Sequence, residues 1–251
     1  MDVTGLEIVE DRTEGSLADE GFLRIRRYRL RHVHADGSRG APYPCDVMSR
    51  KDVDAVAVVL YERTGRRVQV VLKEGVRPPV YLRRTKTLVR PDDRERLMVI
   101  EIAAGVLEEG DRGDGAIERR AAAEAEEECG TIIDPAGVRE LGGPSFPSPG
   151  VTDEKVFFAS AAVRIAEATE ILGDGSGMEE GTRRVVLDLR AAIAACRSGE
   201  IPDMKTELAL LRLCDQLGYL PQLDAFVDEL PDALRARFAP PGISVVSESE
   251  A

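Results

Sequence analysis

The chain has 251 residues, of which 43% are hydrophobic and 4% are aromatic. Its 46 acidic and 34 basic side chains give a net charge of −12 at pH 7. An acidic chain gains little from the counterion release that drives binding to nucleic acids, so the composition argues against a nucleic-acid partner. The length is sufficient for one large domain or for a domain with appendages.

The four cysteines, Cys45, Cys129, Cys196 and Cys214, stand apart, and none forms a CxxC pair. With only two histidines in the chain, the residues for a zinc site are scarce. The first residues carry no apolar signal segment, and no stretch approaches the roughly 18 apolar residues of a membrane-spanning helix. We therefore expect reduced thiols, a cytoplasmic location and no membrane partner.

The first part of the chain is expected to hold a flexible arm followed by strands. Residues 1–20 are polar and acidic, which is typical of a loose arm. Residues 22–33 alternate apolar and basic side chains over most of their length, which is the periodicity of a strand with one charged face. A short returning strand is expected at residues 45–48.

The next segment is expected to form a hairpin and a further strand. Residues 54–61 are a nearly continuous β-branched run, typical of a buried strand, and residues 68–73 return after a turn. Residues 83–96 form a basic loop that contains proline. The strand at residues 97–102 follows this loop.

The second half of the chain is expected to alternate helices and strands. A helix over residues 116–129 ends at Gly130, which is a usual residue just beyond a helix C-terminus. Strands at residues 156–163 and 185–189 flank a glycine-rich acidic loop at residues 173–181. Further helices are expected at residues 189–197, 203–217 and 223–238, followed by a disordered tail.

The helix over residues 116–129 carries a cluster of carboxylates. Glu124, Glu127 and Glu128 are spaced i, i+3 and i+4, so their side chains share one face of a helix. Glu126 lies about 200° around the helix from Glu124 and is expected to face elsewhere. Carboxylate oxygens are the ligands that Mg²⁺ takes in proteins, which makes this face a candidate metal site. The alternative is a solvated helix face in an acidic protein.

The segment from Gly105 to Gly130 resembles the Nudix box, the G-x5-E-x7-R-E-U-x-E-E-x-G-U signature of the Nudix hydrolases. Gly105 matches the first glycine, and Asp111 takes the place of the first glutamate. The second half of the box is matched by Glu124, Glu127, Glu128 and Gly130.

Three features of the segment depart from this signature. Eleven residues, where the family has seven, separate Asp111 from Ala123, which stands at the position of the motif's arginine. Thr131 fills the final apolar position. In the family that arginine steadies the catalytic carboxylates. Arg119 or Arg120, one turn earlier on the same helix, is a candidate to substitute in part.

Four further segments resemble the branch of this family that hydrolyses ADP-ribose and nucleoside-diphosphate sugars. They are KEGVRPP at residues 73–79, EIAAG at 101–105, SPGVTDE at 148–154 and IPDMKT at 201–206. With the Nudix box they cover most of the chain, from about residue 22 to residue 217. The resemblance implies a Nudix-type α/β/α sandwich with a mixed sheet, N-terminal antiparallel strands and a C-terminal helical extension.

The resemblance also implies how the chain is divided. After the flexible arm at residues 1–20, the β region at residues 21–50 would pair two subunits, which makes the chain a homodimer. The Nudix hydrolase domain would span residues 51–217. A helix and a disordered tail would occupy residues 218–251.

The activity implied by the resemblance is Mg²⁺-dependent hydrolysis, with Mn²⁺ as a possible replacement, of the diphosphate linkage in a nucleoside diphosphate derivative. ADP-ribose or a sugar nucleotide would give a nucleoside monophosphate and a sugar phosphate. The metal ligands would be the Ala104 carbonyl, Glu124, Glu127 and Glu128. The substrate-binding residues would be Arg77, Glu101, Ser148, Gly150 and Glu154. Glu179 or Glu180, in the glycine-rich loop, would assist catalysis.

Two other classes of function remain open from the sequence. The first is a catalytically weak or silent Nudix domain that binds a nucleotide for regulation, which Ala123 and the lengthened loop favour. The three retained glutamates argue against it, because a pure binding domain has no need of a repulsive carboxylate cluster. The second is an acidic scaffold that uses its C-terminal helices for partners. It leaves the ordered motifs unexplained.

Overall fold

The computed structural model describes residues 3–11, 22–171, 173, 181–238 and 240–246. The chain divides into two compact units. The N-terminal unit comprises Met1–Asp54 and Phe146–Lys155, and the main unit comprises Ala55–Ser145 and Val156–Ala251.

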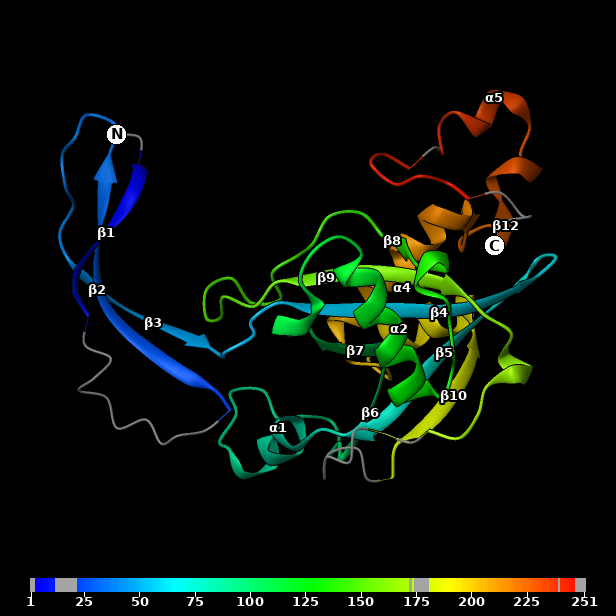
Figure 1. Cartoon of the computed structure of the whole chain (residues 1–251), viewed down its shortest axis with the longest axis horizontal. Coiled ribbons are helices and arrows are strands. Elements are labelled where there is room, and N and C mark those ends of the chain that lie inside the picture. Colours follow the sequence, from blue (N-terminus) through cyan, green and yellow to red (C-terminus); the bar gives the residue numbers. More distant parts are fainter. Residues whose placement is uncertain (1–2, 12–21, 172, 174–180, 239, 247–251) are drawn as a thin grey trace. The chain divides into compact units, whose positions relative to one another are not determined.

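The main unit is built on a seven-stranded mixed sheet (Figure 1). Its strands are β4 (Ala55–Thr64), β5 (Arg67–Val76), β6 (Met98–Glu101), β7 (Ala103–Val106), β8 (Arg139–Glu140), β9 (Val156–Ala162) and β10 (Arg183–Asp188). The order is β10-β5-β4-β9-β8, with β6 also paired to β5 and β7 also paired to β4. The β4 and β9 pair is parallel and the other pairs are antiparallel.

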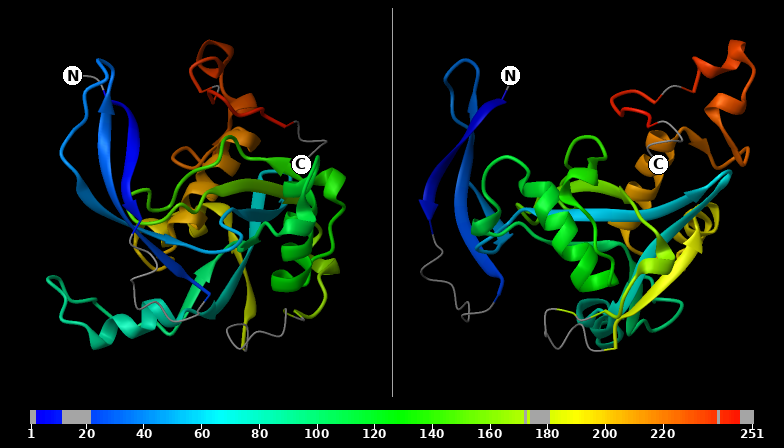
Figure 2. Two further views of the ribbon diagram at one scale, coloured as in Figure 1. Left: turned by 60° about the vertical axis from the view of Figure 1, so that its left-hand side comes forward. Right: turned by 45° about the vertical axis from the view of Figure 1, so that its right-hand side comes forward.

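Strand β4 is buried on both of its faces, because successive side chains of a strand point to opposite sides of the sheet. Val56, Val58 and Leu60 pack in one cluster with α2 (Ala116–Cys129). The alternate side chains of the strand pack in a second cluster with α3 (Leu189–Arg197) and α4 (Met204–Leu217). The two layers of helix lie on opposite sides of the sheet (Figure 2), so the predicted α/β/α arrangement is confirmed.

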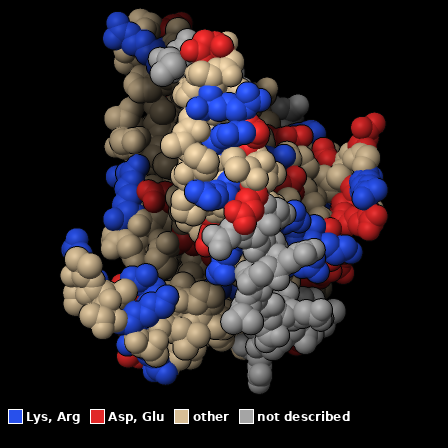
Figure 3. Space-filling view, turned by 90° about the vertical axis from the view of Figure 1, so that its left-hand side faces the viewer, with Lys and Arg blue, Asp and Glu red and all other residues tan. Residues whose placement is uncertain are grey.

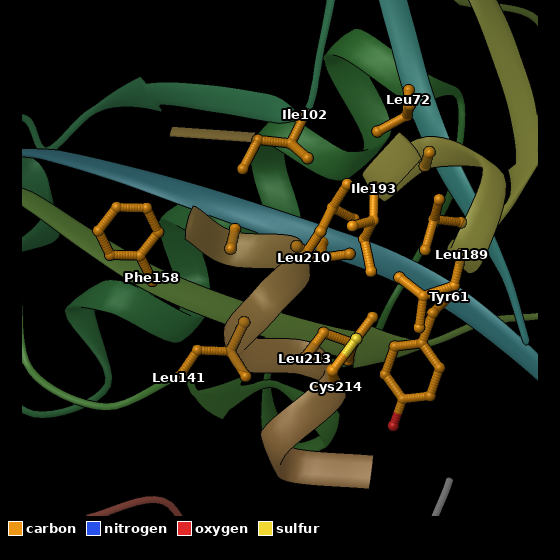
Figure 4. Close-up of a cluster of buried hydrophobic side chains, with 14 of the residues drawn as sticks. Tyr61, Leu72, Ile102, Leu141, Phe158, Leu189, Ile193, Leu210, Leu213 and Cys214 are labelled. Carbon is orange, nitrogen blue, oxygen red and sulfur yellow. The ribbon is translucent and has the colours of Figure 1, made fainter. Parts of the chain in front are cut away.

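The core between the sheet and helices α3 and α4 is built mainly from aliphatic side chains, with the aromatic rings of Tyr61 and Phe158 among them (Figure 4). Leu72 and Ile102 come from the sheet side, and Ile193, Leu210 and Leu213 come from the helices. Each such side chain stabilises the fold by about 1.5–3 kcal/mol on burial. All four cysteines of the chain are free.

The C-terminal part of the main unit differs from the prediction. Instead of a helix over residues 223–238, the structure has short elements: β11 (Tyr219–Leu220), β12 (Ala225–Phe226), a 3₁₀ turn η6 (Val227–Glu229) and α5 (Asp232–Arg235). The physical reason is Pro231, because proline disfavours helical backbone at the preceding residue and lacks the N–H of a helix interior. A helix can therefore not run through Pro231 and can begin only at or just after it, as α5 does.

Short turns complete the main unit. They are the helical turn α1 (Pro78–Tyr81) and the 3₁₀ turns η2 (Leu82–Thr85), η3 (Glu109–Asp111), η4 (Pro135–Gly137) and η5 (Ile165–Glu167). The first two follow β5, and η2 overlaps the start of the basic loop predicted at residues 83–96. No helix in the part of the chain that the structure describes has both the length and the apolar character needed to cross a membrane.

The N-terminal unit contains a three-stranded antiparallel sheet of β1 (Val3–Asp11), β2 (Arg24–His34) and β3 (Tyr43–Ser49). The prediction of a flexible arm over residues 1–20 is therefore wrong for β1. An arm is unpaired chain, whereas Glu7 of β1 pairs with Arg31 and Arg39. The hydrogen bonds from these two arginines lower the pKa of Glu7 to about 2. Lys and Arg side chains are spread over the surface that Figure 3 views.

Residues 146–155 group with the N-terminal sheet rather than with the hydrolase domain predicted over residues 51–217. The Met48 N–H donates to the Val151 carbonyl at 2.8 Å, and the Ser49 hydroxyl donates to Asp153 at 2.8 Å. These bonds attach the segment to the end of β3. The prediction missed this grouping because the partners are about 100 residues apart in the sequence.

Candidate active site

The candidate site begins at helix α2, whose end is determined by Gly130. This residue has a φ of 60°, a left-handed conformation that glycine adopts without strain. A Cβ at this position would lie 2.5 Å from the Thr169 carbonyl oxygen, so the close approach also requires glycine. The Thr169 N–H donates to the Gly130 carbonyl at 2.7 Å. The helix therefore stops where the sequence predicts.

The glutamates of α2 are distributed over its faces as their spacing predicts. Glu124 and Glu128 are each 7% exposed and Glu127 is half-buried, whereas Glu126 is exposed. Burial, together with the charges of Glu128 and Glu127, raises the pKa of Glu124 to about 7. The helix thus presents a buried carboxylate whose neighbours carry the same charge.

The Glu124 carboxylate lies against the backbone of β7 at Gly105. A Cβ built on Gly105 would lie 1.7 Å from one Glu124 carboxylate oxygen and 2.6 Å from the other. No side chain can therefore replace the glycine hydrogen while Glu124 keeps its place. This close approach gives a structural reason for the glycine that matches the start of the Nudix box.

Glu128 is held by two partners on the sheet. Lys73 of β5, only 4% exposed, forms an ion pair with one Glu128 oxygen, and the Ala104 N–H donates to the other at 2.9 Å. Burial nevertheless raises the pKa of Glu128. From the sequence alone, Lys73 is recognisable only as the start of the motif KEGVRPP. The available signal was a single lysine at the end of the apolar run VQVVLK, where an unpaired charge would be costly to bury.

The position of the motif's arginine is occupied by Ala123, and Arg120 lies among the carboxylates instead. Its guanidinium is 2.9 Å from Asp111, 3.1 Å from Glu108 and 3.6 Å from Glu124. Arg119, the other candidate, donates to backbone carbonyls, including that of Asp114 at 2.7 Å. Of the two arginines, Arg120 is therefore the one that contacts the carboxylates.

A second group of charges surrounds Glu101 at the end of β6. Arg77 forms an ion pair with its Oε1 atom, and the Lys205 ammonium lies 4.0 Å from its Oε2 atom. Among the described residues, the buried Oε1 atom has this charge partner but no hydrogen-bond donor. Lys205 also contacts Asp203 at 2.8 Å. Two cations therefore flank one carboxylate.

The segment IPDMKT attaches helix α4 to the sheet beside Glu101. The Asp203 carboxylate caps the helix by accepting from the Thr206 N–H at 2.9 Å. The buried Thr206 hydroxyl donates to Asp203 at 2.7 Å and accepts from the Ile102 N–H at 2.9 Å. The motif residues Arg77, Glu101 and Lys205 are brought together in this way, although they are up to 128 positions apart.

The other predicted site residues do not belong to this arrangement in the main unit. Ser148, Gly150 and Glu154 lie in the N-terminal unit. There the Ser148 carbonyl accepts from Val151 and Thr152 in a turn, and Glu154 pairs with Arg50 at 2.8 Å. Glu179 and Glu180 fall outside the described residues.

The donor chemistry at α2 suits a hard divalent cation. Among the described residues Glu124 accepts no hydrogen bond, and its nearest cation is Arg120. The charges of Glu127 and Glu128 raise its pKa, and a bound cation would relieve that repulsion. The described residues contain no group of three or more His, Cys, Asp or Glu side chains already arranged around one point for a metal ion. Glu128 in particular is engaged by Lys73.

Comparisons with known proteins identify the fold. No protein-family model and no curated protein sequence matches the chain. The structure is similar to a solved structure described as "Crystal structure of ADP compounds hydrolase", with a TM-score of 0.57 and 13% sequence identity. The match covers 86% of this chain and 96% of that chain. The shared fold is the Nudix-type mixed α/β fold, with a central mixed sheet, an N-terminal three-stranded sheet and C-terminal helices.

Proposed function

We propose that the chain is a Mg²⁺-dependent hydrolase that cuts the diphosphate linkage of ADP-ribose or a nucleoside-diphosphate sugar. The products would be a nucleoside monophosphate and a sugar phosphate. The observation that carries the proposal is the buried Glu124 carboxylate, which packs against Gly105 and shares its helix face with Glu127 and Glu128. A pure binding domain would have no need of such a repulsive arrangement.

Glu124 and Glu127 are the proposed ligands of the cation, with the Ala104 carbonyl and Glu128 completing the set. When bound, Mg²⁺ would neutralise the diphosphate and acidify the attacking water. Arg120 restrains the Glu124 carboxylate from the helix side. Lys73 of β5 forms an ion pair with Glu128, so this ion pair has to loosen if Glu128 is to bind the cation directly.

Arg77 is the proposed phosphate ligand of the substrate. It lies with Lys205 beside Glu101, and Lys205 is also paired with Asp203 at 2.8 Å. The charges of this group therefore balance, and Arg77, whose side chain is 31% exposed, is the cation that a phosphate can reach. Ser148, Gly150 and Glu154 remain proposed substrate-binding residues of the N-terminal unit. Glu179 or Glu180 remains the proposed catalytic loop glutamate.

A second candidate is a Nudix-type domain that binds a nucleotide and hydrolyses it weakly or not at all. The ion pair of Glu128 with Lys73 favours it, because a carboxylate already neutralised by a buried lysine is a poorer metal ligand. In this case the ligand would be the same class of compound, but the cluster would serve regulation.

The decisive experiment is a substrate screen with matched variants. Purified protein would be incubated with ADP-ribose, UDP-glucose or GDP-mannose and millimolar Mg²⁺ or Mn²⁺, and released phosphomonoesters would be measured. We expect Glu124→Gln to abolish turnover without unfolding the protein, and Glu126→Gln to be nearly silent because that side chain is exposed. Glu128→Gln should also abolish turnover, but it should lower stability, because it leaves the buried Lys73 without its ion-pair partner. Absence of hydrolysis with every substrate, together with saturable binding, would favour the second candidate.

A further inference from the structure

The segment between β5 and β6 forms a separate excursion from the sheet. The Arg77 N–H donates to the Leu97 carbonyl at 3.0 Å, which closes the base of the excursion. Between these residues the chain forms α1, η2 and a stretch without further regular structure. We call residues 78–96 the basic loop, which comprises the loop predicted at residues 83–96 and the five residues before it. Neither its side chains nor its hollow has a role in the hydrolysis proposed above.

The basic loop surrounds a hollow of about 1150 Å³. This is somewhat above the range of about 300–1,000 Å³ that is usual for small-molecule sites. Three of the residues that line the hollow are acidic and six are basic. The basic residues are Arg83, Arg84, Lys86, Arg90, Arg94 and Arg96. In a chain with a net charge of −12, this is a local reversal of charge.

Three of these six cations are neutralised within the protein. Their ion pairs are Arg83 with Asp92 at 2.9 Å, Arg84 with Glu95 at 3.5 Å and Arg94 with Glu200 at 2.5 Å. These pairs tie the two sides of the loop to each other and to the residues before α4. They shape the hollow but leave little charge for a ligand.

The other three cations keep their charge. Arg96 donates to the Gly199 and Glu200 carbonyls, which fixes its guanidinium without a carboxylate partner. Lys86 and Arg90 are exposed, and neither has an ion pair or hydrogen bond from its side chain to another described residue. Asp93 is the one lining carboxylate without a described cation partner. The hollow therefore has an excess of positive charge that is accessible to solvent.

The wall of the hollow also has apolar parts. Val80, Tyr81, Leu88, Pro91 and Pro202 line it. The Arg84 guanidinium lies 3.8 Å from the centre of the Tyr81 ring, so this aromatic side chain is held in place by a cation–π contact. A ligand that fits the hollow combines negative charge with some apolar surface.

We propose that the hollow of the basic loop is a binding site for a phosphate-bearing small molecule, with Lys86 and Arg90 as its principal ligands. Phosphate oxygens are strong acceptors for both lysine and arginine. A small ligand fits better than a polynucleotide, because the three cations without a described carboxylate partner lie in one hollow and the chain as a whole has a net charge of −12. The proposal goes beyond the proposed hydrolysis and does not depend on it.

The test measures binding of inorganic tripolyphosphate and of ATP by titration calorimetry, with EDTA present to remove divalent cations from the carboxylates of α2. We expect saturable binding to the full chain. Lys86→Glu and Arg90→Glu should each weaken it by about tenfold or more, as expected for the loss of a charge-assisted hydrogen bond. Arg237→Glu is the matched control, because it changes the net charge equally at an exposed residue outside the loop.

Four results would overturn the proposal. The first two are no binding of either compound and equal affinity in wild type and both loop variants. The others are an equal loss in Arg237→Glu and tighter binding of a single-stranded oligonucleotide than of ATP. Because the titration contains no metal and no turnover, it can succeed when the hydrolase proposal fails. Arg77→Ala provides the converse comparison, since it should impair hydrolysis, while the tripolyphosphate binding that it retains should still be weakened by Lys86→Glu and Arg90→Glu.

Discussion

Arg120 lies three positions before Ala123, which stands where the Nudix signature has its arginine. Three positions are nearly one helical turn, so a side chain there can reach the same side of α2. The structure places its guanidinium between Asp111, Glu108 and Glu124. The loop that is longer than in the signature brings Asp111 to this arginine. The longer loop and the replacement of the motif's arginine by Ala123 are therefore related to each other.

The first prediction concerns this arginine. Arg120→Ala should slow hydrolysis by about 10- to 150-fold, if one charge-assisted hydrogen bond of about 1.5–3 kcal/mol is lost in the transition state. Ala123→Arg should change the wild-type rate little, but it should restore part of the rate in the Arg120→Ala background. Steady-state kinetics of the four proteins measures both effects.

Arg119→Ala is the control for this experiment, because it removes the same charge from the adjacent residue. The Arg119 side chain donates its hydrogen bonds to backbone carbonyls. Arg119→Ala should therefore lower the stability of the protein but change the rate of hydrolysis little. A loss of rate in Arg119→Ala as large as in Arg120→Ala would show that the arrangement of the carboxylates does not depend on Arg120.

The second prediction concerns how the free energy of unfolding depends on pH through the single residue Glu124. The pKa of Glu124 is about 7 in the folded protein, against an ordinary value of 4.5, because of burial and the charges of Glu128 and Glu127. The folded state therefore binds more protons than the unfolded state between these values. Without metal, the free energy of unfolding should fall as pH rises from about 4.5 to 7, by on the order of 3 kcal/mol from this group.

Urea unfolding in EDTA at several pH values measures this dependence. Glu124→Gln should remove the part of the pH dependence that comes from Glu124. It should also stabilise the protein at pH 8, because glutamine carries no charge. Glu126→Gln, at the exposed position of the same helix, should retain the wild-type dependence. Equal pH dependence in all three proteins would contradict the raised pKa.

At the scale of elements, the contact of α2 with β7 decides the geometry of the candidate site. The two elements meet where Glu124 lies against Gly105 and Glu128 accepts from the Ala104 N–H. Helix α4 is fixed to the neighbouring strand end through Thr206. The site is thus assembled from one helix face and the backbone of two short strands.

The third prediction tests this contact. Gly105→Ala should reduce turnover at least as much as Arg120→Ala, because its Cβ would occupy the space of the Glu124 carboxylate. Gly143→Ala is a matched control, since a Cβ there meets nothing within 4 Å. Turnover, Mg²⁺ dependence and thermal unfolding of the two variants would be compared. Full activity in Gly105→Ala would mean that Glu124 does not act from its observed position.

At the scale of the whole molecule, the N-terminal unit is the part of the chain that remains proposed as a subunit interface. Its sheet has β1 and β3 at the edges, and Phe22, Leu23 and Ile25 are exposed apolar side chains near the start of β2. An exposed strand edge with apolar neighbours is suited to pairing with a second copy.

The fourth prediction concerns this assembly. The full chain should sediment as a homodimer at micromolar concentration, and deletion of residues 1–35, which removes β1 and β2, should give a monomer or an aggregate with little activity. Analytical ultracentrifugation and the substrate assay measure the two effects. A full-length chain that sediments as a monomer at this concentration would refute the proposed homodimer.

The sequence by itself determined the elements whose periodicity is strong. The helix at residues 116–129, the helix at 189–197 and the buried strand after residue 54 follow from alanine content, apolar spacing and β-branched runs. It also placed Glu126 away from Glu124 and Glu128, because helical geometry alone separates them. The prediction of a helix over residues 223–238 is wrong because Pro231 interrupts it. This local signal against a helix was outweighed by the apolar spacing.

Only the tertiary structure decided which distant residues meet. Lys73 pairs with Glu128 across 55 positions and Arg50 with Glu154 across 104. Neither pairing follows from local spacing, since each depends on how strands and loops are brought together. The choice between Arg119 and Arg120 was of the same kind. Both are possible on a helix wheel, and the position of Asp111 at the end of η3 selects Arg120.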